Sequence, residues 1–493
     1  MRTGNLLKLP IPAVAAVLAL AFAAPVPAAD AGVREPVVTR HEGVFNGQVV
    51  RYRAVVSELV VPDADGNPGA AIVSTAYLAE NPANGPRRPV LFAFNGGPIS
   101  PSAYLHMGML GPRRVHVPDD LSADPASFEV VDNAYTLLDV ADIVFFDPAG
   151  TGFSRVVDGK NPRDYFSVVA DGQQTAAFVT EWLRANGRES SPAWLFGESY
   201  GTMRAAEAAR QLAEAGRSLA GVVLFGQALN IIEFSQRPGN IVSYVVSLPT
   251  LTALGLYHGK VDARGRDLET LLAESARYAR TEYLEALFLG SALEPRDRAR
   301  VARRLEELSG IPADFYLANG LRITKERYRT ELLKDRNLIL GRNDGRYAAP
   351  VTEAGNAFDP SGVVPDAYLR AFREHLREFL GIDWDEEYVA RSPVKGLEDW
   401  SWGATSPFSD WPYMQLISVA MEKNPEFRVL VANGIHDTST TIGAAEYAVR
   451  QSGWPEERTR LEFYVGGHMA YSIESTLEEM TDDLRELLAG AAN

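Results

Sequence analysis

Residues 193–201 have the sequence AWLFGESYG, and this stretch decides the fold class. Its first four residues (193–196) form a short apolar run that predicts a buried strand, and residues 202–215 have helical periodicity. Between them, GESYG matches the G-x-S-x-G pattern, in which a tight turn from strand to helix exposes Ser199 at the carboxyl edge of a sheet. The alternative is an ordinary glycine-containing turn between a strand and a helix.

The rest of the chain alternates short apolar runs with helical patterns, which is typical of strands buried on both faces of a parallel sheet. Near the start, a turn-rich stretch separates two runs of alternating polarity (49–61 and 70–77) and predicts a hairpin. We therefore expect an α/β fold, with a mostly parallel central sheet flanked by helices. The expected parallel strands are residues 89–94, 141–146, 193–196, 221–225, 427–432 and 460–465, and the expected helices are 169–186, 202–215 and 473–489.

The short apolar runs that predict strands are missing between residues 225 and 427. Charge-rich helical patterns, such as 267–289 and 295–308, take their place. The segment has no low-complexity linker, so the pattern favours an insertion over a flexible connection. The expected organisation is an α/β core in two parts, residues 30–230 and 401–493, with a mainly helical cap at 231–400.

Residues 1–29 have the order of a secretory signal peptide: basic residues, an apolar stretch (11–24) and a run of small residues. The apolar stretch is shorter than the roughly 20 residues that span a bilayer, which disfavours a retained anchor. We expect cleavage after Ala28 or Ala29, and a periplasmic or secreted protein with no membrane contact after cleavage.

Composition excludes several classes of function. Lys and Arg number 48 against 64 Asp and Glu, and the resulting net charge of −16 disfavours binding to nucleic acid. The chain has no cysteine, so disulfides, thiolate nucleophiles and zinc–thiolate sites are ruled out. None of its seven histidines pairs with another at the i, i+4 spacing. We expect no metal and no cofactor.

A serine hydroxyl becomes a nucleophile when a histidine takes its proton, and a carboxylate must orient that histidine. On this architecture the chain order is Ser, acid, His. Asp437 follows the expected strand 427–432, and His468 follows the strand 460–465, so both lie at the carboxyl edge of the sheet. We expect Ser199, Asp437 and His468 to form a catalytic triad. The alternatives are a turn-capping aspartate and a surface-loop histidine.

An acyl-transfer site also needs two backbone N–H groups to stabilise the oxyanion. One comes from the residue after the nucleophile, here Tyr200. The other comes from the loop after an earlier strand, where residues 95–98 have the sequence NGGP and Gly97 is our candidate. A plain β-turn is the alternative for this loop.

Five sequence blocks, in order, resemble the serine carboxypeptidase-like family, especially its bacterial branch. The resemblance implies an α/β-hydrolase fold and acyl transfer at Ser199, Asp437 and His468, with Gly97 and Tyr200 donating to the oxyanion. The blocks are FNGGP (94–98) with LGPRRV (110–115), DPAGTGFS (147–154), GESYG (197–201), VANGIHD (431–437) and GGHMAY (466–471).

The resemblance also implies how a substrate would be held. In this family the Asn of NGGP and the Glu before the nucleophile bind the C-terminal carboxylate of the substrate, which corresponds here to Asn95 and Glu198. Two carboxylates at hydrogen-bond distance are not both ionised, so Glu198 must be protonated. We therefore expect peptide hydrolysis to be better at acid pH.

Three departures bear on the substrate. Ile99 stands where the family has a glycine, Met109 stands in place of a frequent carboxylate, and the family's cysteines are missing. The preferred interpretation is an exported serine carboxypeptidase-like hydrolase that removes C-terminal residues from peptides through an acyl-enzyme on Ser199. An esterase or acyltransferase on small aromatic or acylated metabolites stays open, as does a catalytically silent ligand-binding protein.

Two further residues have two interpretations each. Arg204, on the expected helix after Ser199, could bind an acidic substrate or form a buried structural ion pair. His106 could line the pocket near the oxyanion loop or serve core packing.

Overall fold

The computed structural model describes residues 33–80, 87–351, 358–390, 399–403 and 411–489. The chain from Arg34 onward forms one compact unit. The expected signal peptide lies outside the described residues. None of the helices in the described part of the chain has the length and apolar character needed to cross a membrane.

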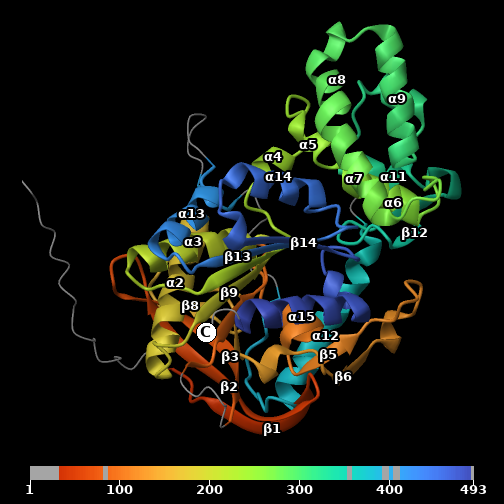
Figure 1. The fold of residues 1–493 in the computed structure, drawn as a ribbon. Coiled ribbons are helices and arrows are strands. Elements are labelled where there is room, and N and C mark those ends of the chain that lie inside the picture. The colour runs from red at the N-terminus through yellow and green to blue at the C-terminus, as the bar shows by residue number, and fades with distance from the viewer. Residues whose placement is uncertain (1–32, 81–86, 352–357, 391–398, 404–410, 490–493) are drawn as a thin grey trace, which may run out of the picture. The chain divides into compact units, whose positions relative to one another are not determined.

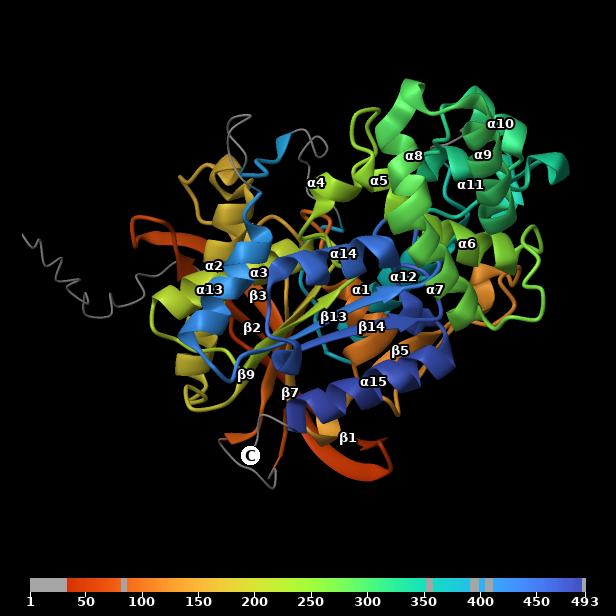
Figure 2. The same ribbon diagram turned by 45° about the horizontal axis from the view of Figure 1, so that its top comes forward.

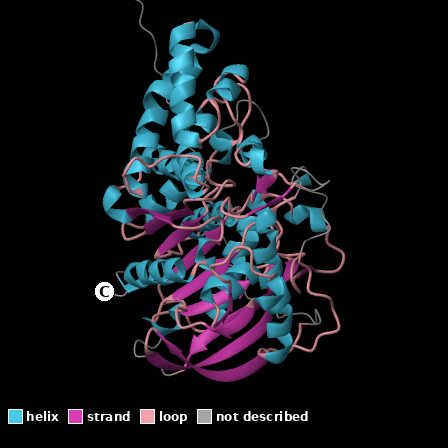
Figure 3. Cartoon of the chain, turned by 90° about the vertical axis from the view of Figure 1, so that its right-hand side faces the viewer, coloured by secondary structure: helices cyan, strands magenta, loops and turns pink. Residues whose placement is uncertain are grey.

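A ten-stranded sheet forms the centre of this unit (Figures 1 and 3). Its order is β1-β2-β3-β7-β4-β9-β10-β13-β14, with β8 paired to β3. The strands from β7 to β14 are parallel to one another, and β1, β2, β3 and β8 are antiparallel to their neighbours. The strands are β1 (Val37–Phe45), β2 (Gln48–Pro62), β3 (Pro68–Ala79), β4 (Val90–Phe94), β7 (Asp142–Phe146), β8 (Arg155–Val156), β9 (Ala193–Glu198), β10 (Gly221–Phe225), β13 (Arg428–Gly434) and β14 (Thr459–Tyr464).

The predicted mostly parallel sheet is confirmed, and each of the six expected strands is present within two residues of its predicted limits. The predicted hairpin is β2 and β3. Two small antiparallel pairs lie outside the main sheet and were not predicted, namely β5 (Arg113–His116) with β6 (Glu129–Asp132) and β11 (Leu338–Leu340) with β12 (Ala348–Pro350).

The register brings the carboxyl ends of the central strands together. Phe94 of β4 lies opposite Gly197 of β9, and Glu198 lies opposite Phe225 of β10. Because the strands are parallel, the loops that follow them emerge at the same edge of the sheet. This edge carries the predicted site residues.

Alternating strand residues separate into two hydrophobic clusters, one on each face of the sheet. Phe92 and Leu195 belong to the cluster with α2, α3 and α13, and Leu91 and Trp194 belong to the cluster with α12 and α15. Burial on both faces explains why these strands are continuous apolar runs in the sequence. The helices are α1 (Ala103–Leu105), α2 (Val168–Ala185), α3 (Gly201–Glu214), α12 (Val363–Glu378), α13 (Tyr413–Lys423), α14 (Ile442–Ser452) and α15 (Glu474–Ala489).

The segment between β10 and α13 is mainly helical, and its first part has a hydrophobic cluster of its own (residues 244–340). Figures 1 and 2 show these helices, drawn in green, grouped beside α14 and apart from α2 and α3. α12 lies within the range expected for the cap, yet its apolar side chains belong to the core cluster. The limits of the cap therefore stay a prediction. The helices of the group are α4 (Ile231–Phe234), α5 (Val242–Val245), α6 (Leu248–Tyr257), α7 (Leu268–Tyr278), α8 (Leu284–Leu289), α9 (Pro295–Ser309), α10 (Ala313–Ala318) and α11 (Lys325–Glu331).

Candidate active site

Ser199 lies in the tight turn between β9 and α3. Its φ is 60°, a left-handed conformation that is uncommon for a residue with a side chain and marks a constrained turn. The Ser199 N–H donates to the carbonyl of Phe225 at 2.8 Å, and its own carbonyl accepts from the N–H of Thr202 at 2.9 Å. These bonds fix the turn between two strand ends and the first turn of the helix.

Asp437 and His468 are directly hydrogen-bonded. Asp437 is fully buried in the turn after β13, and its Oδ2 lies 2.6 Å from Nδ1 of His468. The N–H groups of Ser439 and Thr440 donate to Asp437 Oδ1, and the Thr440 hydroxyl donates to Oδ2. Burial lowers the pKa of His468, but the charge and hydrogen bond of Asp437 and the charge of Glu198 together raise it to about 9.

Ser199 and His468 each lie against the end of β10. A Cβ atom on Gly226 would lie 3.0 Å from Cε1 of His468, and the neighbouring Phe225 carbonyl accepts from the Ser199 N–H. Among the described residues, Ser199 and His468 form no hydrogen bond with each other, and Nδ1 of His468 is bonded to Asp437. Such contacts often tighten when substrate binds.

The loop after β4 packs directly on the serine turn. A Cβ atom on Gly96 would lie 2.5 Å from the backbone nitrogen of Tyr200, so this approach requires a residue without a side chain. Within the described ranges, the N–H groups of Gly97 and Tyr200 donate to no other part of the chain. Both predicted oxyanion donors are therefore free to bind a ligand beside Ser199.

Glu198 is a buried carboxyl group next to the serine. It is 2% exposed, and its Oε2 accepts from the Tyr471 hydroxyl at 2.8 Å. Burial, reinforced by the charge of Asp437, raises the pKa of Glu198 to about 7, although His468 and the hydrogen-bonding groups of Tyr471 and Asn95 oppose this. The acid is thus protonated over a range in which an exposed glutamate is ionised.

The side chain of Asn95 is partly engaged. Its Oδ1 accepts from the Leu105 N–H at 2.9 Å, whereas Nδ2 is buried and forms no hydrogen bond of normal geometry within the described residues. A buried donor without a partner is costly unless a ligand satisfies it. The amide of Asn95 faces the carboxyl of Glu198, so the two residues place a donor and a protonatable acid side by side.

Arg204 forms a buried ion pair, which confirms the structural interpretation of this residue. Its Nε lies 2.8 Å from Oδ2 of Asp171, and both side chains are almost fully buried. Its Nη1 donates to the carbonyl of Asn95 at 2.6 Å. Arg204 therefore supports the loop that carries Asn95.

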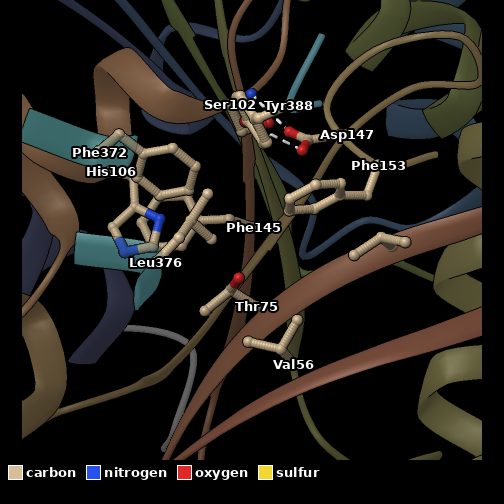
Figure 4. A pocket seen from close by; sticks show the side chains of 11 residues that line it. Val56, Thr75, Ser102, His106, Phe145, Asp147, Phe153, Phe372, Leu376 and Tyr388 are labelled. Atoms are coloured by element: carbon tan, nitrogen blue, oxygen red, sulfur yellow. Dashed lines mark hydrogen bonds between the residues drawn. The ribbon is translucent and has the colours of Figure 1, made fainter. Parts of the chain in front are cut away.

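Figure 4 shows a small cavity whose lining includes Ser102, His106, Asp147 and Tyr388. Asp147 accepts hydrogen bonds from the Ser102 N–H and the Tyr388 hydroxyl, and His106 lies 2.6 Å from the Tyr77 hydroxyl. The cavity volume of about 10 Å³ leaves room for one water molecule at most, so a substrate does not fit. His106 thus serves packing and also lines this closed cavity.

Two of the three departures are replaced side chains, and they lie in different parts of the fold. Ile99 is partly buried in the loop after β4, with a φ of 67°. Met109 is fully buried in a core cluster, within the short π-helix His106–Leu110 (η2). The side chain that replaces the family's carboxylate thus contributes to the core.

Three residues near the site were not predicted. Tyr471 belongs to the GGHMAY block, so its position in that block could have signalled it. Thr440 lies three residues after Asp437, a spacing at which a side chain can bond the aspartate. Lys325 lies in the helical insertion and carries no local sequence signal.

The arrangement provides a serine hydroxyl, an imidazole bonded to a carboxylate, and two free N–H donors. Among the described residues, no group of three or more His, Asp or Glu side chains could hold a metal ion. These groups support nucleophilic acyl transfer. With the parallel sheet, they define a serine hydrolase of the α/β-hydrolase fold.

Comparison with known families tests the resemblance that the sequence suggested. The serine carboxypeptidase family model matches residues 77–224, which contain Asn95, Gly97 and Ser199. The resemblance to serine carboxypeptidases is thus confirmed, without distinguishing a bacterial branch. None of the curated proteins matches the chain.

Solved structures share the fold at low sequence identity. The crystal structure of Kex1Δp, a prohormone-processing carboxypeptidase from Saccharomyces cerevisiae, matches with a TM-score of 0.51 and 14% identity over 87% of this chain and 91% of that chain. A proline iminopeptidase from Mycobacterium smegmatis matches with a TM-score of 0.38 and 16% identity, over 88% and 99% of the two chains. The match to Kex1Δp extends the fold similarity beyond the residues of the family model.

Proposed function

We propose that the protein is an exported serine carboxypeptidase-like hydrolase that removes C-terminal residues from peptides. The observation that carries the proposal is the buried Glu198, whose pKa is raised to about 7, next to the open amide of Asn95. A protonated carboxyl and an amide N–H are both donors, and together they suit a substrate carboxylate. Their position beside Ser199 suits a carboxylate close to the scissile bond.

In the proposed reaction, Ser199 Oγ forms a bond to the peptide carbonyl carbon while its proton passes to His468. Asp437 orients the imidazole and stabilises its charged form, and the N–H groups of Gly97 and Tyr200 bind the oxyanion. The C–N bond then breaks as His468 returns the proton to the departing amine. Water, activated by His468, attacks the acyl-enzyme and restores the serine.

The deciding experiment compares the wild type with Ser199→Ala on blocked dipeptides and p-nitrophenyl esters, with products identified by mass spectrometry. We expect release of free C-terminal amino acids, reduced by about 10⁴-fold or more in the variant. Peptide release that persists in Ser199→Ala would refute the role of the serine. No release from either substrate would favour a silent ligand-binding protein.

An esterase or acyltransferase is the second candidate, and Ile99 favours it. The family's glycine is replaced by a branched side chain in the oxyanion loop, which changes the space for a leaving group. Serine-dependent ester cleavage without any release of amino acids would support this candidate over the carboxypeptidase.

Export is supported by the basic, apolar and small-residue order of residues 1–29. We expect the protein to be recovered from the periplasm or the medium with an N-terminus at Ala29 or Asp30, as determined by N-terminal sequencing. Recovery of the full-length chain from the cell interior would contradict this proposal.

A further inference from the structure

Lys325 is a buried cation that the helical insertion places near the candidate triad. It is the first residue of α11, and its Nζ donates to the carbonyl of Ser439 at 2.8 Å. The ammonium also lies over the ring of Phe234, 5.1 Å from its centroid. In the described part of the chain, no carboxylate lies within ion-pair distance of Nζ.

Both ends of the lysine are fixed. Its backbone N–H donates to Oε1 of Gln236 at 2.6 Å, and Gln236 belongs to the segment that follows α4. Its ammonium is held by the Ser439 carbonyl and the Phe234 ring. A long side chain fixed at both ends loses rotamer entropy, so its contacts must compensate for that loss.

Ser439 connects the lysine to the acid of the triad. Its N–H donates to Oδ1 of Asp437 at 2.7 Å, while its carbonyl accepts from Lys325. One residue thus links a side chain of the insertion to the turn that holds the carboxylate. Displacement of Lys325 would loosen this turn.

We propose that Lys325 is a positioning residue through which the helical insertion acts on the candidate triad, by holding Ser439 and with it the turn that carries Asp437. This inference rests on the proposed function of the triad. Lys325 acts through other residues, because its known contacts are with Ser439, Phe234 and Gln236.

The charge of Lys325 adds an electrostatic effect on the base. Besides its own burial, the groups that act on His468 are Asp437 and Glu198, which raise its pKa, and Lys325, which lowers it. Burial lowers the pKa of Lys325 itself, which Asp437 and Glu326 partly offset, to about 8. Below that pH the lysine is charged and opposes protonation of His468, which must be neutral to accept the serine proton.

The test measures kcat/KM against pH for a p-nitrophenyl ester, which has no C-terminal carboxylate and so avoids the requirement for protonated Glu198. The variants are Lys325→Met, which removes the charge and the donor, and Lys325→Arg, which keeps both. Lys334→Met is the matched control, because Lys334 follows the same helix but pairs with Glu331 and is largely exposed.

For Lys325→Met we expect the acid limb of the profile to move up by about 0.5–1 pH unit and the maximum to fall several-fold. Lys325→Arg should keep the limb within about 0.2 units of the wild type, and Lys334→Met should leave the profile unchanged. An unchanged maximum in Lys325→Met would overturn the positioning role, as would an arginine variant no better than methionine, and an unmoved acid limb would overturn the electrostatic effect.

If Lys325→Met does not fold, Lys325→Gln serves instead, because it keeps a donor for Ser439 and removes the charge alone. For Lys325→Gln we expect the same upward shift of the acid limb as in Lys325→Met, with a smaller fall in the maximum kcat/KM. An acid limb that does not move would overturn the electrostatic effect. Failure of the proposed function is distinguishable, since wild-type activity would then survive Ser199→Ala or be missing altogether.

Discussion

Asn95 lies between two buried carboxyl groups that differ in their partners. Asp171 of α2 is paired with Arg204, and its Oδ1 accepts from the Gln174 side chain. Glu198 of β9 has the Tyr471 hydroxyl and the open amide of Asn95 as neighbours, with no cation at ion-pair distance in the described residues. Both carboxyl groups are thus buried, but the protein supplies the cation that pairs with Asp171, whereas Glu198 is left to bind a ligand.

This difference in partners indicates a structural role for Asp171 and a binding role for Glu198. Burial raises the pKa of Asp171 above its usual value, and the charge and hydrogen bond of Arg204 oppose the rise by stabilising the ionised form. Burial raises the pKa of Glu198 to about 7, even though the charge of His468 opposes the rise, and no arginine pairs with it among the described residues. The paired carboxylate supports the loop through Arg204, and the unpaired acid stays available for substrate.

The largest expected effect comes from breaking the ion pair between Asp171 and Arg204. Arg204→Met leaves Asp171 buried without its cation, so we expect a loss of about 3–5 kcal/mol in the free energy of unfolding, measured by denaturant titration. Arg184→Met is the control on α2, the helix that carries Asp171, because Arg184 pairs with Glu181 near the surface and its loss should cost under about 1 kcal/mol. Equal losses in the two variants would contradict the structural role.

Removal of the open acid should affect recognition more than stability. For Glu198→Ala we expect the ratio of kcat/KM for a peptide acid to that for its amide to fall about 10–100-fold, the worth of a charge-assisted hydrogen bond. The free energy of unfolding should change little compared with Arg204→Met, because no buried charge is left without a partner. A ratio that does not change would remove Glu198 from the carboxylate site.

The pH dependence sharpens the same comparison. Because the pKa of Glu198 is raised, its protonated form dominates below about pH 7 and is lost as the pH rises through that value. The preference for the peptide acid over its amide should therefore be greatest below about pH 7 and decline above it. Taking this ratio cancels the titration of His468, which both substrates share.

Glu198→Gln provides the control for this titration, since glutamine donates at every pH. In this variant the preference should no longer decline above about pH 7. A decline identical to that of the wild type would assign the titration to another group.

Much of the fold and site was predictable because its signals are local. The strand, turn and helix around Ser199 follow from residues 193–215, and the parallel strands follow from their apolar runs. The contacts that distinguish Asp171 from Glu198 join residues distant in sequence, as Tyr471 and Glu198 are separated by 273 positions. No pattern along the chain specifies which buried polar groups will meet.

Lys325 illustrates the same limit within the insertion. Its helix could be expected from composition, but its contact with Ser439 spans 114 positions and depends on how the insertion packs. Charge-rich helices give a weak signal for packing, since most of their charged side chains face solvent. The boundary of the insertion was difficult for a related reason, because the amphipathic α12 packs on the core.

The smallest expected effect concerns Ile99, whose φ of 67° is unfavourable for a β-branched residue. Ile99→Ala and Ile99→Gly both remove the partly buried side chain, and they differ in the backbone freedom of the new residue. Glycine is usually less stable than alanine by about 0.5–1 kcal/mol, but here the left-handed conformation should reverse the order, making Ile99→Gly more stable by about 1 kcal/mol. Paired thermal unfolding measures this difference, and a glycine variant less stable than the alanine variant would show that the loop holds residue 99 without strain.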